Sequence, residues 1–426
     1  MTALSATHRT IDAIWRIEST KLIAGLARMV RDIGLAEDLA QDALVIALER
    51  WPLSGIPDNP GAWLMTTAKR RAIDLKRRSQ LYNRKLDDLG RSVDTYTEDD
   101  LDIAMEGEIG DDILRLIFMT CHPVLSSDAR VSLTLRLLGG LTTDEIAHAF
   151  LVAESTIAQR IVRAKRTLSS AHVAFDVPTG EELKVRLSTV LEVIYLMFNE
   201  GYSATSGGSW LRPLLCQEAL RLGRILAESA PLEPEVHGLV ALMEIQSSRF
   251  RTRVNAAGEP ILLMEQNRAL WDQLLIRRGL TAIERARKLG RPLGPYALQA
   301  AITACHAQAR SAEDTDWVRI SALYEALSRA APSPIVELNR AVAIAMAFGP
   351  DFGLQIVDEL TADSSMKEYH LLPSVRGDFL LKLGRSEEAR AEFESAALLT
   401  RNERERELLL KRAAECEIST SEQDGQ

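Results

Sequence analysis

Six cations stand close together between residues 60 and 78, and they suit ionic contact with phosphate. They are Lys69, Arg70, Arg71, Lys76, Arg77 and Arg78, with Asp74 as the one acid among them. Pro60 fits the first turn of a helix, and the residues that follow are good helix formers, so we expect a helix from Pro60 to Arg78. Cations crowded on about two turns repel one another unless phosphate neutralises them. The alternative is a solvated helix end whose cations favour the C-terminal dipole.

A second pattern, at residues 141–168, predicts two short helices that cross closely. Thr142 with Glu145 three residues later forms a capping box, and Ile146, Ala147 and Phe150 supply an apolar face. In the next segment an apolar stripe at helical spacing faces inward: Ile157, Ile161, Ala164 and Leu168. The polar side chains left outward are Ser155, Thr156, Gln159, Arg160 and Arg163. This is the spacing of a helix-turn-helix that offers hydroxyl, amide and guanidinium groups to a major groove, although an unrelated helical hairpin would show it too.

Groups suited to covalent catalysis are sparse. The sequence has no phosphate-binding loop, dinucleotide fingerprint or zinc-protease motif. Cys121 and His122 are adjacent but have no second ligand at metal spacing, so we interpret Cys121 as a packed thiol beside a helix break. We therefore expect no enzymatic activity, no cofactor and no metal site.

The charge distribution divides the chain into segments of opposite sign. The whole chain of 426 residues has a net charge of -9. Residues 87–112 hold 11 acids and one base, whereas the rest of 1–172 holds 21 Lys and Arg against 13 Asp and Glu. Residues 173–426 hold 29 bases and 36 acids. The pattern predicts two basic modules joined by an acidic tether and followed by an acidic body.

Helical periodicity runs through nearly every long segment, and strand-like alternation is almost absent, so the predicted fold class is all-α. We expect modules at 8–80 and 112–172, a linker at 81–111, and a C-terminal domain at 181–418, with the main boundary near residue 176. In that last domain, 378–396 and 339–349 read as tetratricopeptide-like hairpins, with Gly349 and Gly384 35 positions apart. The segment 249–258 reads as an exposed loop between helices; a short hairpin whose cations and Trp271 line a regulatory surface is the less favoured interpretation.

The sequence shows no signal for secretion or for a membrane. No apolar run approaches the length that crosses a bilayer, and the first 21 residues lack the apolar core of a secretory signal. The four widely spaced cysteines suggest no disulfide framework. We expect a cytoplasmic protein that does not bind membranes.

Taken in this order, the segments resemble a bacterial extracytoplasmic-function RNA polymerase sigma factor, from the group with a long C-terminal tetratricopeptide-like extension. Residues 36–43 look like the family's polymerase-binding helix, and 61–74 look like its promoter −10 helix. The helix-turn-helix resembles the fourth sigma region, which reads the −35 element. The extension is similar to the group's at 195–202, 333–343 and 369–373.

The resemblance assigns roles to individual residues. It implies core polymerase contacts by Glu37, Asp38, Gln41 and Asp42, with the −10 strand held by Asn59 and the six cations of 69–78. It implies −35 contacts by Ser155, Thr156, Gln159, Arg160, Arg163, Lys165 and Arg166. Ala158 and Gln159 depart from the residues that many relatives have there, so we expect few direct base contacts at those positions. Trp63 is either a platform for a base or, as we favour, part of the core.

The function expected from the resemblance is that of a promoter-specificity subunit, with core RNA polymerase and promoter DNA as partners. The acidic linker would thread toward basic walls of the polymerase, or would be merely solvated. The C-terminal domain would regulate the sigma modules and offer a surface for a protein or peptide. The alternative function is that of a helix-turn-helix regulator with a tetratricopeptide sensor that never joins polymerase.

Overall fold

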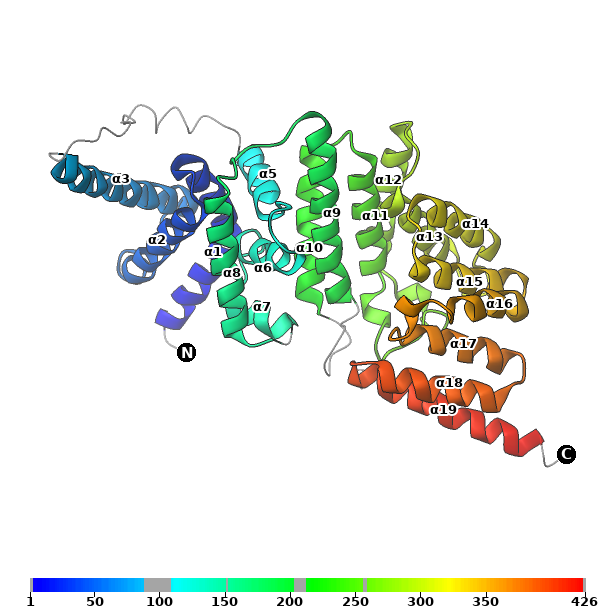
Figure 1. Ribbon diagram of the computed structural model, residues 1–426. Coiled ribbons are helices and arrows are strands. Elements are labelled where there is room, and N and C mark those ends of the chain that lie inside the picture. The colour runs from blue at the N-terminus through cyan, green and yellow to red at the C-terminus, as the bar shows by residue number, and fades with distance from the viewer. Residues whose placement is uncertain (1–2, 88–108, 151, 203–211, 256–258, 424–426) are drawn as a thin grey trace. The chain divides into compact units, whose positions relative to one another are not determined.

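A computed structural model describes residues 3–87, 109–150, 152–202, 212–255 and 259–423 of the protein. Within these ranges every named element is an α-helix or a short 3-10 helix, and one isolated antiparallel bridge joins Val254 to Pro260. The predicted all-α class is therefore confirmed (Figure 1). The core of the acidic linker lies outside the described residues.

The chain divides into two compact units, residues 1–194 and 195–426. The division falls inside helix α9 (Gly180–Tyr202), whereas the boundary expected near residue 176 falls before that helix. The domain limits expected from the sequence remain predictions.

Three long helices begin the first unit: α1 (Ala3–Val30), α2 (Ile33–Ser54) and α3 (Pro60–Asp87). Asp32 caps α2, because its carboxylate accepts a hydrogen bond from the backbone N–H of Leu35 at 2.8 Å. Pro60 begins α3 as expected, but the helix continues past Arg78 into the linker range. The three helices pack around a core that includes Leu22, Ile23, Leu26, Leu39, Ala43 and Leu64.

Four shorter helices form the second half of this unit: α5 (Ile109–Thr120), α6 (Ser127–Leu137), α7 (Thr143–Phe150) and α8 (Glu154–Ser170). The predicted capping box is confirmed: the Thr142 N–H donates to Glu145 Oε2 at 2.9 Å, and the Glu145 N–H donates to Thr142 Oγ1 at 3.1 Å. The apolar stripe predicted for residues 157–168 is buried at all four positions. The helix-turn-helix geometry therefore follows from local caps and one apolar face.

The first part of α9 belongs to the first unit. The guanidinium of Arg186 is buried and donates to the backbone carbonyl of Phe118, at the end of α5, at 2.8 Å. Further along α9, Glu192 lies 3.6 Å from Arg130 of α6. These contacts explain why the chain divides within α9 and not before it.

The second unit continues from the end of α9 as a succession of helices (Figure 1). They are α10 (Pro213–Ser229), α11 (Pro234–Ser247), α12 (Gln273–Lys288), α13 (Pro295–Gln308), α14 (Trp317–Ala330), α15 (Pro334–Phe348), α16 (Pro350–Leu360), α17 (Leu371–Lys382), α18 (Ser386–Leu399) and α19 (Glu403–Gln423). Short 3-10 helices lie at Phe250–Thr252 (η1), Arg268–Leu270 (η2) and Ser364–Met366 (η3). Proline occupies the first turn of five of these helices, where its missing N–H costs no hydrogen bond.

Two glycines shape the helical hairpins that the sequence predicts. Gly349 and Gly384 both have positive φ, +120° and +75°, a conformation that side chains with a Cβ rarely adopt. Gly349 joins α15 to α16, and Gly384 lies between α17 and α18. Ala389 and Phe393 of α18 are fully buried. At the α15–α16 crossing, a methyl group on Gly353 would come within 2.6 Å of the Ala345 Cβ, so only glycine permits this close approach.

The segment after α11 is buried in part. Arg249 and Arg253 are buried, as is Trp271 at the end of η2. The Asn255 N–H donates to the Glu259 carbonyl at 2.9 Å, so the segment does turn back as a short hairpin. The favoured interpretation of 249–258 as solvent-exposed is therefore wrong for Arg249 and Arg253, because these two cations pack on aromatic rings, whereas Arg251 is exposed.

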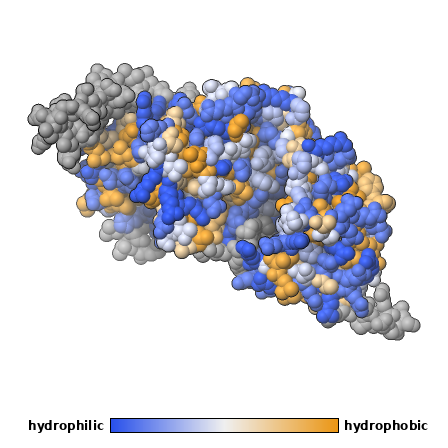
Figure 2. Space-filling view, in the orientation of Figure 1, coloured by the Kyte–Doolittle hydropathy of each residue, from blue (hydrophilic) through white to orange (hydrophobic). Residues whose placement is uncertain are grey.

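Hydrophilic and hydrophobic side chains are interspersed over the visible face of the molecule (Figure 2). Among the described helices none is both long enough and apolar enough to span a bilayer.

Candidate nucleic-acid interface

Helix α8 exposes the polar face predicted to meet DNA. Ser155, Thr156, Gln159, Arg163 and Arg166 are all exposed to solvent. The opposite face is anchored by the buried stripe, so the exposed side chains are held on a rigid helix. Their hydroxyl, amide and guanidinium groups suit a major groove and its flanking phosphates.

Two other cations predicted for this surface are engaged within the protein. The Arg160 Nη2 atom lies 3.0 Å from Asp128 Oδ2, at the start of α6. Lys165 is partly buried and forms an ion pair with Glu37 of α2. Arg160 and Lys165 are therefore less free to meet phosphate than Arg163 or Arg166.

The cations of α3 lie along one long helix. Arg70, Arg71 and Arg77 are exposed and Lys69 is half-buried; the side chains of Lys76 and Arg78 lie outside the described residues. Arg71 Nε is 3.9 Å from Asp42, and both side chains are about half exposed, so solvent screens this pair and either group can exchange partners.

Asn59 has a structural role at the start of α3. Its side-chain oxygen accepts a hydrogen bond from the Ala62 N–H at 3.0 Å, which caps the helix. Asn59 and Lys69 also line a hollow of about 360 Å³ between α1 and α3. Trp63 is half-buried and meets the buried Trp51 edge-on, with ring centroids 5.2 Å apart. Trp63 thus has a packing partner, in line with the interpretation that we favoured.

On α2, the four predicted polymerase contacts separate into two groups. Asp38 and Asp42 are exposed, whereas Glu37 is only 3% exposed. Gln41 is half-buried and donates its amide to Glu37 Oε1 at 2.7 Å. The exposed Asp38 and Asp42 lie about one turn apart on α2, and the neighbouring Glu37 is buried.

The buried Glu37 carboxylate joins the two halves of the first unit. Arg136 Nε, at the end of α6, donates to Glu37 Oε1 at 2.8 Å, and Lys165 of α8 pairs with Glu37 Oε2. A buried carboxylate needs cationic partners, because taking it out of water without them costs several kcal/mol. We call Glu37, Arg136 and Lys165 the Glu37 triad.

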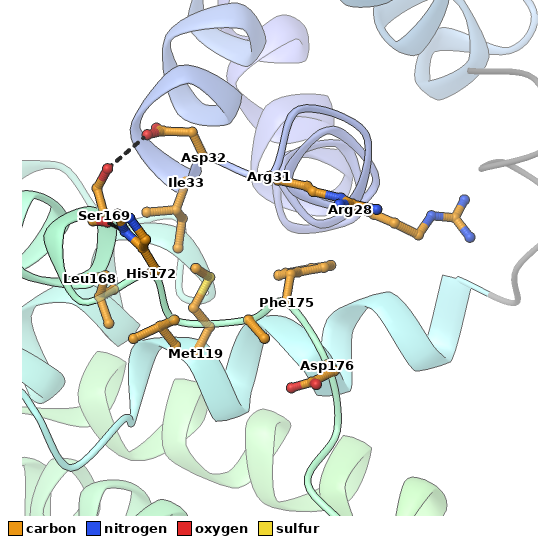
Figure 3. Close-up of a pocket in the computed structure, with 12 residues that line it drawn as sticks. Arg28, Arg31, Asp32, Ile33, Met119, Leu168, Ser169, His172, Phe175 and Asp176 are labelled. Atoms are coloured by element: carbon orange, nitrogen blue, oxygen red, sulfur yellow. Dashed lines mark hydrogen bonds between the residues drawn. The ribbon is translucent and has the colours of Figure 1, made fainter. Parts of the chain in front are cut away.

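We call the boundary between α1–α3 and α5–α8 the seam, and other contacts cross it. The Thr20 hydroxyl of α1 donates to the Leu138 carbonyl at 2.9 Å in a buried position, and Arg28 lies 3.5 Å from the buried Asp112. Figure 3 shows the Ser169 hydroxyl donating to Asp32 at 3.3 Å, at one edge of a cavity of about 620 Å³. Residues of both halves line this cavity, so ion pairs and a cavity both lie between the two halves.

Cys121 is a packed thiol, as predicted. It is buried after the end of α5 near the Thr120 and Thr134 hydroxyls, and burial raises its pKa to about 11. The thiol is therefore protonated and unreactive at neutral pH. Among the described residues, no three His, Cys, Asp or Glu side chains gather as metal ligands.

Sequence reasoning missed the Glu37 triad and the burial of Arg249, Arg253 and Trp271. Each of these residues is polar or amphipathic, and each meets partners far away in the chain. The only sequence signal for Lys165 is its place directly after Ala164, at the margin of the buried stripe.

Comparison with known proteins identifies the two halves of the first unit. Residues 18–82 match the Sigma-70 region 2 family, and residues 115–168 match Sigma-70, region 4. Residues 186–287 match a family of unknown function (DUF6596). No solved structure matches the chain.

Three relatives extend the match. An uncharacterized protein of Rhizobium meliloti (strain 1021) is 40% identical over 381 residues, 89% of each chain. The ECF RNA polymerase sigma factor SigK of Mycobacterium ulcerans (strain Agy99) is 32% identical over 154 residues, 35% of this chain and 78% of the relative. The probable ECF RNA polymerase sigma factor SigI of Mycobacterium tuberculosis (strain CDC 1551 / Oshkosh) is 29% identical over 199 residues, 44% of this chain and 68% of the relative.

Both sigma regions are matched in order, and the match to SigK covers 78% of that relative. The chain therefore belongs to the extracytoplasmic-function family of RNA polymerase sigma factors.

Proposed function

We propose that this sigma subunit, which directs transcription initiation with core RNA polymerase at promoter DNA, binds through three surfaces of its first unit. The exposed face of α8 reads the −35 element, α3 and the hollow beside Asn59 hold the −10 strand, and the acids of α2 bind polymerase. The observation that carries the proposal is the exposed polar face of α8, opposite a fully buried stripe, in a capped helix-turn-helix.

The α8 surface is suited to both kinds of DNA contact. Arg163 and Arg166 project from the exposed side of the helix and would neutralise phosphates, a contact that sets affinity and salt dependence. Ser155, Thr156 and Gln159 lie in the first two turns, the part of a recognition helix that meets base edges. A hydroxyl reads bases with low selectivity, and Gln159 departs from the residues that many relatives have there, so we expect few specific base contacts from this helix.

We further propose that the described arrangement is a closed form of the sigma modules. Glu37 is one of the polymerase contacts implied by the family, yet Arg136 and Lys165 already occupy its carboxylate. Lys165 is in turn a DNA contact implied by the family, and the same ion pair occupies it. Polymerase would offer Glu37 a basic surface in place of these two cations, and opening would release Lys165 toward DNA.

The energies of the ion pairs allow this exchange to act as a switch. Removing one partner from a buried ion pair costs about 3–5 kcal/mol, because the other charge is left unpaired. Opening without a replacement partner is therefore rare, whereas opening against a basic polymerase surface restores the lost interactions. Binding to polymerase and access to Lys165 would thus be coupled.

The second unit is proposed to regulate the first. It adds acidic helical hairpins that neither DNA nor polymerase binding requires, and stacked hairpins form extended surfaces suited to a protein or peptide partner. The protein would act in the cytoplasm. A regulator that never joins polymerase is not favoured, because it would need neither the Sigma-70 region 2 match nor the exposed acids of α2.

The first prediction concerns polymerase and the second unit. We expect the full chain to bind purified core polymerase and to start transcripts at defined positions on genomic DNA, measured by sequencing RNA 5′ ends. A chain ending at Ile194 keeps the α9 contacts of the first unit and should change transcript yield at matched concentrations of folded protein. Failure of the folded full chain to bind core polymerase would refute the sigma assignment. Unaltered activity and affinity of the shorter chain would eliminate the regulatory role.

The second prediction distinguishes cations on α8. Arg163→Ala should weaken binding of the polymerase holoenzyme to duplex DNA and lower the magnitude of the salt slope by about one, since one phosphate contact is lost. Arg160→Ala should do so less, because Asp128 already holds that guanidinium. Arg401→Ala, an exposed arginine of the second unit, is the matched control. Fluorescence anisotropy over a salt series measures this, and identical slopes for all three variants would rule out the recognition-helix assignment.

The third prediction tests the closed form. Lys165→Met removes one partner of Glu37 while keeping the length of the side chain, so it should raise the open fraction. Binding to core polymerase should tighten about tenfold for each 1.4 kcal/mol by which the substitution destabilises the closed form. Arg166→Met removes an adjacent exposed cation and should leave the affinity unchanged. Binding is measured without DNA, so that lost phosphate contacts do not contribute. Equal affinities of Lys165→Met and the unmodified protein, both folded, would contradict the closed form.

A further inference from the structure

Three arginines of the second unit lie in one buried row between aromatic rings. The Cζ atom of Arg253 is 3.6 Å from the centroid of the Tyr202 ring, at the end of α9. The Cζ atom of Arg249 is 5.7 Å from the centroids of both Tyr202 and Trp271. The Cζ atom of Arg268, the first residue of η2, is 5.4 Å from the centroid of the Trp271 ring. We call this row of cations and rings the arginine ladder.

The ladder is buried and has little compensating negative charge. The three arginines are only 7–8% exposed. No ion pair joins Arg249 or Arg268 to a carboxylate of the described residues; the acids that act on Arg268, Glu313 and Asp314, are exposed. Aromatic faces attract cations, but they replace only part of the hydration that a buried guanidinium loses. Arg249 and Arg268 therefore carry positive charge that the aromatic rings do not neutralise.

Several donors in the ladder also lack an acceptor. The Nη atoms of Arg268 donate to the His306 carbonyl and the Thr315 hydroxyl, both at 2.9 Å. The Nε atoms of Arg249 and Arg268 and the indole Nε1 of Trp271 are buried and have no hydrogen-bond partner among the described residues. Arginine and tryptophan nitrogens only donate, so what these groups need is an acceptor.

His306 lies near two of these arginines, and their charge affects its pKa. Burial and the nearby Arg249 and Arg268 lower its pKa to about 3, so the ring is neutral at physiological pH. Its edge packs on Trp317, with ring centroids 5.1 Å apart, and its Nδ1 atom has no partner among the described groups. His306 is therefore neutral and adds no further positive charge beside Arg249 and Arg268, where an anion would bind.

We propose that the arginine ladder is a binding site for a small oxyanion, a phosphate or carboxylate group, held at Arg249 between Tyr202 and Trp271. An oxyanion supplies negative charge and several acceptors at once, which matches buried guanidinium and indole N–H groups. The depth of the arginines favours a compact group over a folded partner surface. This site is independent of promoter and polymerase binding, and it would let a small molecule act on the second unit.

The test is calorimetric titration and thermal unfolding of the full chain with inorganic phosphate, and separately with acetate, against chloride at equal ionic strength. We expect one oxyanion to bind saturably and to raise the unfolding temperature. Arg249→Gln should weaken that binding about tenfold or more, since a charged hydrogen-bonded contact is lost. Arg251→Gln removes an exposed arginine of η1, the 3-10 helix that Arg249 precedes, and should bind as the unmodified protein does.

Trp271→Phe keeps the proposal testable if Arg249→Gln does not fold, because it keeps an aromatic ring while removing the unpaired indole N–H. It should weaken binding of the preferred anion severalfold while retaining the fold. Stronger stabilisation by phosphate than by acetate would identify a phosphate site, and the reverse a carboxylate site. Absence of saturable binding by either anion, or equal binding by the Arg249 and Arg251 variants, would overturn the proposal.

Discussion

A carboxylate that is almost entirely buried has to keep its cationic partners, and the first unit is organised around one such group. Glu37 accepts hydrogen bonds from Gln41 on its own helix and from Arg136, and it pairs with Lys165. The partners come from α6 and α8, so one buried charge ties region 2 to region 4. In the closed form that we propose, a partner that offers this carboxylate a basic surface would open the seam.

Most of the helices were predictable because their signals are local. The capping box of Thr142 and Glu145, the apolar stripe of α8 and the glycine turn at Gly384 each depend on residues a few positions apart. Helix ends were harder to predict. The helix α3 continues to Asp87 because nothing in the sequence after Arg78 breaks it, and α9 joins the first unit through the long-range contact of Arg186 with Phe118.

The exposed face of α8 was predictable from the sequence, but the pairing of its cations within the protein was not. Helical periodicity places Arg163 on the outer face of α8, and the structure exposes it. The same periodicity cannot tell that Lys165, at the edge of the apolar stripe, meets a carboxylate 128 positions earlier. The arginine ladder escaped prediction for a similar reason: arginine is usually solvated, and only the fold brings Tyr202 and Trp271 to Arg249.

The exchange of partners at Glu37 is most directly tested by measuring the distance between α2 and α8. Spin labels at Val45→Cys and Val162→Cys, both exposed positions, report it, and the four native cysteines are buried and therefore poorly reactive. Pulsed electron paramagnetic resonance of the free protein should give one narrow distance distribution, which core polymerase shifts to longer distances. An unchanged distribution in a polymerase complex that initiates transcription would contradict the account.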